Sequence, residues 1–254
     1  MEDSKKRPNA KFQMPSSKSP IVVIVGETAS GKSALAYRLA QKFNGELICA
    51  DSRTVYKGMD IGTAKPTLAE RKKIKHHLLD IVNADENFTA AEFKKIANMA
   101  MSDILGRGKL PIMVGGTGLY VDGVIYDFGF GKNGDKKPLR PNTLLIGLPL
   151  DREVLKKRIV ERTDQMLKNG LLEEVTNLSR KYGWQAPAMT AIGYREFQAN
   201  LAGMQTLQAT VELINRNTFL YAKRQRTWFK RNKSIHWIDD PSEAVVLVTT
   251  FLNT

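Results

Sequence analysis

The chain has 254 residues, of which 42% are hydrophobic and 26% charged, a balance that is ordinary for a soluble globular protein and allows one α/β domain to bury a full core. Lysine and arginine outnumber aspartate and glutamate by 39 to 26, and the net charge of +13 favours a polyanionic partner, whether RNA, DNA or a phosphorylated metabolite. The single cysteine, Cys49, excludes an internal disulfide and a cysteine-based zinc site. The sequence has no apolar run of membrane-spanning length, and no apolar stretch follows the basic N-terminus. We therefore expect a cytoplasmic protein that does not enter a membrane.

The elements follow one another in the order expected of an α/β protein. Residues 1–19 are rich in lysine, serine and proline, so we expect a flexible basic tail. The β-branched run 21–25 predicts a buried parallel strand, followed by a helix over 32–43 and a strand over 47–50. The pattern then predicts strands over 78–81, 111–114, 143–148 and 235–238, and helices over 89–105, 152–168, 171–182, 206–231 and from Ser242 onward.

A phosphate-binding motif lies directly between the first predicted strand and the first predicted helix. It reads Gly26-Glu27-Thr28-Ala29-Ser30-Gly31-Lys32-Ser33 and matches G-x-x-x-x-G-K-[ST] in full. In such a loop the backbone N–H groups and the helix N-terminus surround an anion, Lys32 adds a charge, and the Ser33 hydroxyl helps to hold Mg²⁺. We therefore predict a P-loop NTPase or kinase-like α/β fold, with a parallel sheet flanked by helices in three layers. The motif identifies a di- or triphosphate site and leaves the acceptor open.

The second predicted strand ends at Asp51. Side chains at the carboxyl ends of parallel strands face the ligand crevice, so Asp51 is a candidate base or magnesium neighbour, although an Asp-Ser pair at a strand end is also common as a turn cap. The stretch 51–66, from Asp-Ser-Arg-Thr to Thr-Ala-Lys-Pro, resembles the signature of tRNA dimethylallyltransferases. Further resemblances follow in order along the chain, at residues 76–80, 88–93, 114–120, 170–175, 191–196 and 221–229.

The resemblance implies a reaction and assigns roles. The P-loop, residues 26–33, would hold the diphosphate of dimethylallyl diphosphate, and Asp51 would take a proton from the exocyclic amine of an adenine next to the tRNA anticodon. Lys32, Mg²⁺, Thr117 and Arg195 would stabilise the leaving diphosphate. The resemblance places tRNA contacts at Asp51, Ser52, Arg53, Thr54 and Thr117.

A basic run near the C-terminus adds a candidate RNA contact. Residues 223–233 hold six positive charges interleaved with aromatic rings, which favours contact with an RNA backbone over a merely solvated helix face. The tRNA-binding candidates in this run are Lys223, Arg224, Gln225 and Arg226.

Other residues have plainer interpretations. His76 and His77 are adjacent, so in a strand they point to opposite faces, and we expect both to be structural. We expect Tyr194 and Trp228 to pack in the interior. Cys49 is expected to be a small buried residue. Taken alone, Thr117 is equally well explained as a helix N-cap.

The chain departs from the family in one region. Family members carry a helical insertion domain where this chain has only a glycine- and lysine-rich loop, 127–141, within one catalytic domain spanning 20–254. Lys132, Lys136, Lys137 and Arg140 in this loop are a possible electrostatic substitute. Smaller departures are Glu27, where proline is usual, and Phe219, where arginine is common.

Three other functions remain open on the sequence. An adenylate dimethylallyltransferase shares the P-loop chemistry and also lacks the insertion, a small-molecule kinase shares the P-loop, and a non-catalytic RNA-binding protein would need none of these catalytic groups. The full 51–66 signature favours the tRNA enzyme, which we expect to act as a monomer.

Overall fold

The computed structural model describes residues 19–130 and 137–254, so the predicted tail 1–18, Lys132 and Lys136 lie outside the described residues. The sheet has six parallel strands in the order β3-β2-β4-β1-β5-β6. Their bounds are β1 Ile21–Gly26, β2 Gly45–Cys49, β3 His76–His77, β4 Leu110–Gly115, β5 Thr143–Leu148 and β6 Ile235–Trp237. The predicted parallel α/β sheet is confirmed.

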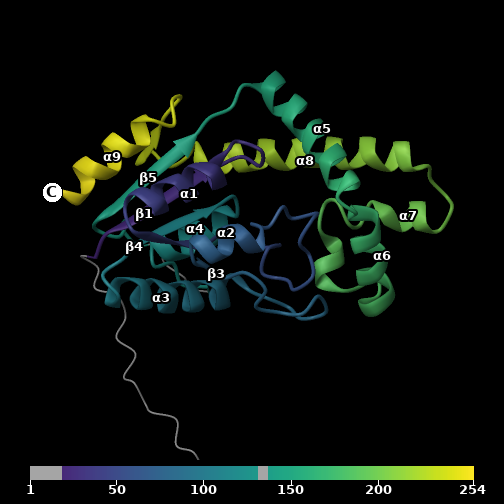
Figure 1. The fold of residues 1–254 in the computed structure, drawn as a ribbon, viewed down its shortest axis with the longest axis horizontal. Helices are drawn as coiled ribbons and strands as arrows, with labels where there is room; N and C mark the ends of the chain where they lie inside the picture. Colours follow the sequence, from purple (N-terminus) through teal and green to yellow (C-terminus); the bar gives the residue numbers. More distant parts are fainter. Residues whose placement is uncertain (1–18, 131–136) are drawn as a thin grey trace, which may run out of the picture.

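Helices cover both faces of this sheet, which gives the predicted three layers (Figure 1). The helices in the described residues are α1 Lys32–Lys42, α2 Leu68–Lys73, α3 Ala90–Gly106, α4 Gly118–Ile125, α5 Arg152–Lys168, α6 Leu171–Tyr182, α7 Phe197–Leu201, α8 Leu207–Phe229 and α9 Glu243–Leu252. Alternation along β1 explains the layers: Ile21, Val23 and Val25 pack with α3, α4 and the end of α8, whereas Val22 and Ile24 pack with α1 and α9. Both sets are fully buried, as expected for a central parallel strand.

A second group of helices, α5 to α8, extends to one side of the sheet (Figure 1). Its own core joins α6 and α7 to the segment that follows β2, through buried residues such as Val55, Met59, Tyr194 and Phe197. The long helix α8 belongs to both parts, because its end packs under β1 while Ile214 packs in the second core. Within the described residues, no helix is long and apolar enough to cross a membrane.

The strand predicted over 78–81 is wrong. The strand in this region is β3, which ends at His77, and Leu78 and Asp80 adopt positive φ values of 65° and 55°. This turn brings the Asp80 carboxylate onto Lys65 and Arg71, an ion-pair gain that a continued strand could not make. Helices α2, α4 and α7 were not predicted, since each is short and α4 begins at Gly118.

Candidate functional site

The P-loop joins β1 to α1, and its backbone takes the conformation that the motif predicts. Gly31 has φ 92° and caps α1, where a side chain would be strained. The Lys32 ammonium donates to the Glu27 carbonyl at 2.9 Å. Burial lowers the pKa of Lys32 to about 8, against the opposing effect of Asp51. The loop thus has the glycine conformation and the buried lysine that a P-loop requires.

Two consecutive residues of α8 hold the P-loop in place. The Gln225 side-chain oxygen accepts from the Thr28 backbone N–H at 2.8 Å, and its amide nitrogen donates to the Gly116 carbonyl at 3.0 Å. Arg226 donates to the buried carboxylate of Glu27 and to the Leu150 carbonyl. Gln225 is buried, so of the four predicted tRNA contacts in this run, Gln225 and Arg226 are committed to interactions within the protein. The reason is their position on the face of α8 that packs beneath the P-loop.

Asp51 and Thr117 lie at the ends of the neighbouring strands β2 and β4. The Asp51 carboxylate accepts from the Arg53 backbone N–H at 2.8 Å, and the Thr117 hydroxyl accepts from the Ser52 N–H at 3.0 Å. Thr117 begins α4 but makes no side-chain cap bond to that helix, so the N-cap alternative does not describe its hydroxyl. Tyr221 on α8 also contacts Thr117, and burial, followed by the charge of Asp51, raises its pKa to about 12.

Ser52, Arg53 and Thr54 form a short turn after Asp51. The Arg53 guanidinium donates to the Pro187 carbonyl at 3.1 Å and to the Thr190 hydroxyl at 3.2 Å, and Thr54 donates to the Asp51 carbonyl at 3.3 Å. The turn thus holds the Asp51 backbone at the strand end and links it to the second helix group.

Two cavities meet at Asp51. The first, of about 1060 Å³, is lined by Lys32, Ser33 and other P-loop residues, and by the segment Lys57–Leu68 in part. The second, of about 310 Å³, is lined by Ser52, Arg53, Arg195, Tyr221 and Arg224 among others. Asp51, Thr28 and Arg162 line both. P-loop residues thus line both cavities, through Thr28 and Ala29, whereas Lys32 and Ser33 line only the first, and the Asp51 carboxylate lies where the two cavities adjoin.

Arg162 of α5 is a site residue that the sequence analysis missed. Its guanidinium donates to the Thr28 hydroxyl at 3.2 Å, and burial lowers its pKa although Asp51 opposes the shift. One turn earlier, Arg158 donates to the Ala29 carbonyl at 3.2 Å. The i, i+4 spacing of the two arginines was the available signal. Because α5 carries many charges, nothing in the sequence distinguishes this pair from a solvent-exposed helix face.

The predicted role of Arg195 at the leaving diphosphate stays a prediction, and the structure shows the surroundings of its side chain. It lines only the second cavity of the two, its side chain is half exposed, and its guanidinium pairs with the buried Glu196 at 3.0 Å. Arg162, by contrast, contacts the P-loop directly through the Thr28 hydroxyl.

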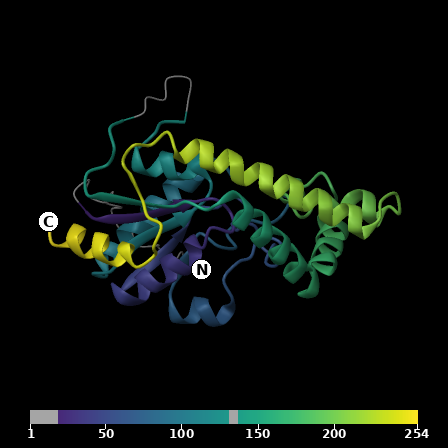
Figure 2. The same ribbon diagram turned by 90° about the horizontal axis from the view of Figure 1, so that it is seen from above.

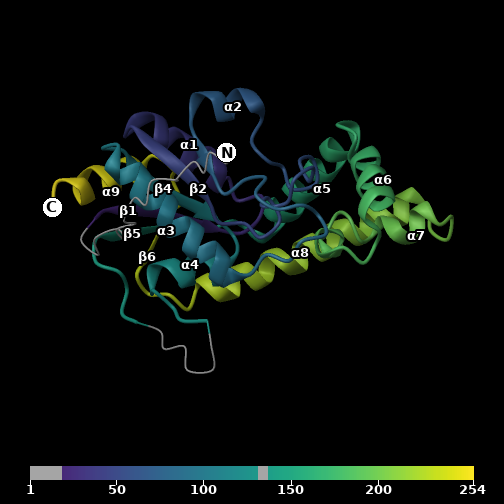
Figure 3. The same cartoon turned by 90° about the horizontal axis from the view of Figure 1, so that it is seen from below.

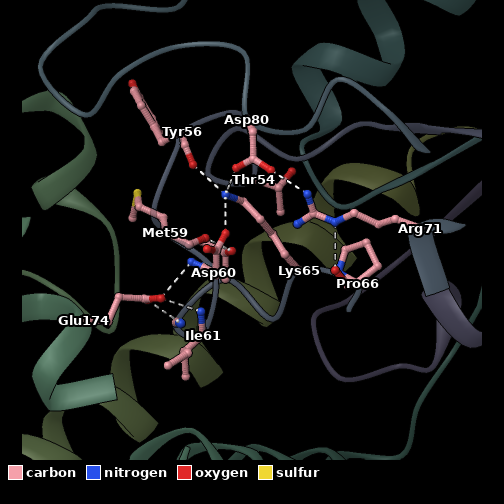
Figure 4. A network of polar contacts seen from close by, with 12 residues as sticks. Thr54, Tyr56, Met59, Asp60, Ile61, Lys65, Pro66, Arg71, Asp80 and Glu174 are labelled. Carbon is pink, nitrogen blue, oxygen red and sulfur yellow. Dashed lines mark hydrogen bonds and ion pairs between the residues drawn. The ribbon is translucent and has the colours of Figure 1, made fainter. Parts of the chain in front are cut away.

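The signature segment 51–66 is held by a polar network (Figure 4). The Lys65 ammonium, buried, donates to Asp60 at 2.9 Å, to Asp80 at 2.5 Å and to the Tyr56 carbonyl at 2.6 Å. Because these contacts use all three ammonium protons, Lys65 lines the first cavity as a structural residue and not as a phosphate ligand.

The plainer predictions hold for most residues. Tyr194 is fully buried. Cys49 is also buried, and burial raises the pKa of its thiol to about 12. His77 pairs with Glu46 at 2.7 Å and His76 contacts the Ile74 carbonyl at 2.7 Å. Trp228 differs, since its ring packs over Gly118 and yet stays 38% exposed.

Oxygen ligands for a hard cation are present near the P-loop. The Ser33 hydroxyl and the Asp51 carboxylate line the same cavity as Lys32. In the described residues no group of three or more acidic, histidine or cysteine side chains gathers to hold a metal by itself. This set fits a magnesium ion that takes most of its ligands from water and a bound diphosphate.

Comparison with known proteins extends over most of the chain. The profile of the family described as IPP transferase matches residues 54–143 and 130–232. A tRNA dimethylallyltransferase of Pelotomaculum thermopropionicum is 36% identical over 285 aligned positions, covering 87% of this chain and 91% of the relative. A Geobacter metallireducens protein of the same name is 37% identical and covers 92% and 97%.

Solved structures give the same result. A tRNA isopentenylpyrophosphate transferase from Staphylococcus epidermidis superposes with a TM-score of 0.84 at 32% identity, covering 92% of this chain and 99% of that one. The full-length Bacillus halodurans enzyme of that name gives 0.85 at 33% identity, covering 93% and 96%. A eukaryotic dimethylallyltransferase acting on tRNA gives 0.80 at 26% identity, covering 87% and 74%.

Proposed function

Because the chain belongs to the tRNA dimethylallyltransferase family, we propose that it transfers the dimethylallyl group of dimethylallyl diphosphate to the exocyclic amine of the adenine adjacent to the anticodon in tRNA. The observation that carries this function is the position of Asp51 on the wall of both cavities, beside Lys32 and Ser33 in the first and beside Tyr221 and Arg224 in the second. A carboxylate in this position suits a base that serves an acceptor, and membership of the family favours prenyl transfer over phosphoryl transfer.

The reaction follows from these positions. The P-loop N–H groups, Lys32 and Arg162 hold the diphosphate, so that the allylic carbon points to Asp51. The adenine amine enters from the second cavity and forms the new C–N bond as the C–O bond to diphosphate breaks. Asp51 accepts the amine proton, which makes a poor nucleophile competent, and the diphosphate leaves with the bonding electrons.

Charge on the leaving diphosphate is the main electrostatic demand. Lys32 and Arg162 meet it from the P-loop side, and Thr117 is placed to donate its hydroxyl once substrate displaces its present contacts. Magnesium, held through Ser33 and the diphosphate oxygens, would add a further charge. Arg195 lines the acceptor cavity, where its partly exposed guanidinium suits an RNA phosphate better than the diphosphate.

The tRNA contacts divide into an inner and an outer group. Ser52, Arg53 and Thr54 surround the acceptor opening, and Lys223 and Arg224 are exposed on α8, with Arg224 on the wall of the same cavity. The acceptor cavity has room for a base, and the exposed cations for its neighbouring phosphates. We keep Gln225 and Arg226 out of this group because they bind the P-loop.

The missing insertion is also part of the proposal. The family profile matches in two parts that overlap at residues 130–143, and the 285 aligned positions of the Pelotomaculum relative exceed the 254 residues of this chain. Both facts support the interpretation that the relative has an insertion that this chain lacks. Of the four loop cations, Lys137 pairs with Asp127, which also pairs with Lys94. Neutralising all four should still flatten the salt dependence of tRNA binding. An unchanged slope would show that the loop cations do not replace the insertion in binding tRNA.

Nucleoside mass analysis tests the activity. Unmodified tRNA or AMP is incubated with labelled dimethylallyl diphosphate and Mg²⁺, and the products are compared for wild type and Asp51→Asn. Dimethylallyl-adenosine in tRNA but not in AMP, lost in the variant, is expected. Label in AMP alone would establish the adenylate enzyme, and an equally active variant would remove Asp51 from the mechanism. A monomer in the cytoplasm fits the single buried cysteine and stays a prediction.

A further inference from the structure

A separate hollow of about 510 Å³ lies between α4 and the end of α8, outside the two cavities that meet at Asp51. Its wall combines the rings of Tyr126 and Trp228 with the side chains of Arg231 and Lys233. Arg231 and Lys233 are exposed, and Trp228 is 38% exposed. An accessible ring beside two cations is the combination that binds a nucleotide of single-stranded RNA, because the base stacks on the ring while the phosphate meets the charge.

The position of this α4–α8 hollow links it to the acceptor side of the catalytic site. Arg224 lines the acceptor cavity and Trp228 lines the hollow, and these two residues are four positions, or ~6 Å of helical rise, apart on one face of α8. Trp228 also packs over Gly118, where an added Cβ would come within 2.3 Å of the indole, and Gly118 follows Thr117. A strand whose adenine occupies the acceptor cavity therefore passes the hollow within about one nucleotide.

We infer that the α4–α8 hollow binds a nucleotide that flanks the modified adenine, with its base stacked on Trp228 and its phosphate against Arg231 and Lys233. This rests on the proposed tRNA substrate. The hollow supplies binding energy from the catalytic domain itself. It favours unpaired RNA over a duplex, since a base can reach the ring only when it is free of its stack.

The cations are tested first. Arg231→Ala/Lys233→Ala is compared with Lys72→Ala/Lys73→Ala, which removes the same charge from exposed residues of α2 on the opposite side of the molecule (Figures 2 and 3). The probe is an anticodon stem-loop RNA, titrated at several salt concentrations. We expect roughly tenfold weaker binding for the first pair and a salt slope lower by about 1.4, with little change for the second. Equal losses in both pairs, or none in the first, would overturn the inference.

The stacking is tested with Trp228→Leu and Trp228→Phe and with RNAs carrying an abasic nucleotide on either side of the acceptor adenine. Trp228→Leu should weaken binding of the intact RNA about tenfold. The same change should not weaken binding of one of the two abasic RNAs, because that RNA lacks the base that stacks on the ring. Trp228→Phe should retain most of the affinity. Full loss with both abasic RNAs would mean that no flanking base stacks there. If Trp228→Leu also loses dimethylallyl diphosphate binding, its packing has failed and the charge variants decide.

The failure of this inference is distinguishable from failure of the proposed function. Wild-type protein that transfers no dimethylallyl group to saturating RNA contradicts the function. Wild-type protein that transfers it, together with hollow variants that bind RNA normally, contradicts only the inference.

Discussion

The Gln225 side chain accepts a hydrogen bond from the Thr28 backbone N–H at 2.8 Å and donates one to the Gly116 carbonyl at 3.0 Å. One amide on α8 thereby joins the P-loop to the loop that carries Thr117. These two loops follow β1 and β4, and in the proposed reaction both contact the diphosphate. The distance between the phosphate cradle and Thr117 is therefore set by a helix more than a hundred residues away in sequence from both.

Replacing Gln225 by leucine should loosen that joint. The change leaves a partly buried N–H and a buried carbonyl unpaired, and a buried group left unsatisfied costs about 1–3 kcal/mol. We expect a lower melting temperature and weaker pyrophosphate binding, measured by calorimetry. Gln208→Leu on the exposed start of the same helix is the control. A variant with lowered stability but unchanged pyrophosphate affinity would show that the joint does not position the P-loop.

The Glu27–Arg226 pair should be strongly coupled. Glu27 is buried and the Arg226 side chain is 31% exposed, and removing one partner of such a pair leaves a poorly solvated charge. We expect about 2–4 kcal/mol lost in Glu27→Ala or Arg226→Met, and much less than the sum in the double variant, from urea unfolding. The exposed Lys156–Glu153 pair should couple by under about 1 kcal/mol. Additive losses would show that the two side chains act independently.

Sequence reasoning reached the sheet, the P-loop and Asp51 because each is written in a local pattern: β-branched runs, glycine spacing and a carboxylate at a strand end. It missed what depends on tertiary packing. Gln225 and Arg226 read as part of a basic RNA-binding run, and only the packing of α8 under the P-loop turns them inward. Arg162 was lost among the charges of α5, and the turn at Leu78–Asp80 replaced a strand because Asp80 pairs with Lys65 and Arg71.

Lys32 should make pyrophosphate binding depend on pH. Burial lowers its pKa in the free protein to about 8. The side chain is therefore positively charged below pH 8 and loses this charge as the pH rises above 8. A bound diphosphate favours the charged form and raises this pKa. Affinity should therefore fall between about pH 8 and 10, with proton uptake on binding. Calorimetry in buffers of different ionisation enthalpy measures that uptake.

Lys32→Arg is the control for this pH dependence. Arginine stays charged over the whole range, so its remaining pH dependence reports the ionisation of pyrophosphate itself. A wild-type profile that parallels the Lys32→Arg profile would show that Lys32 does not titrate in this window.

Glu46 should stabilise the fold only above acid pH. Hydrogen bonds from Arg107, with further contacts from His77 and Lys109, hold the pKa of this buried carboxyl well below its usual value of 4.5. The contribution is present above pH 4.5 and is lost as pH falls below it, because the unfolded chain then takes up the proton first. Urea unfolding of Glu46→Gln should show a large loss at pH 7 that shrinks toward pH 3. Glu161→Gln, at an exposed site, should show neither effect.

Glu174 should decide whether the signature segment keeps its shape. Its carboxylate accepts from the backbone N–H groups of Asp60, Ile61 and Gly62 at 2.7–3.0 Å (Figure 4). It also accepts from the Tyr194 hydroxyl at 2.6 Å. Four donors meet two oxygens, so Glu174→Gln, which keeps the size but has one acceptor oxygen, must leave at least one donor set unpaired. Gly62 packs closely against the Tyr194 ring, where an added Cβ would lie 2.6 Å away.

We expect faster amide hydrogen exchange over residues 60–64 in Glu174→Gln, together with a higher KM for dimethylallyl diphosphate. The reason is that Asp60, Ile61, Thr63 and Ala64 line the same cavity as Lys32 and Ser33, so a loosened wall would change the shape of the proposed substrate cavity. The neighbouring exposed Glu173→Gln should change neither measurement. Faster exchange with an unchanged KM would mean that the segment stabilises the fold without shaping the substrate cavity, and unchanged exchange would mean that Glu174 does not hold the segment.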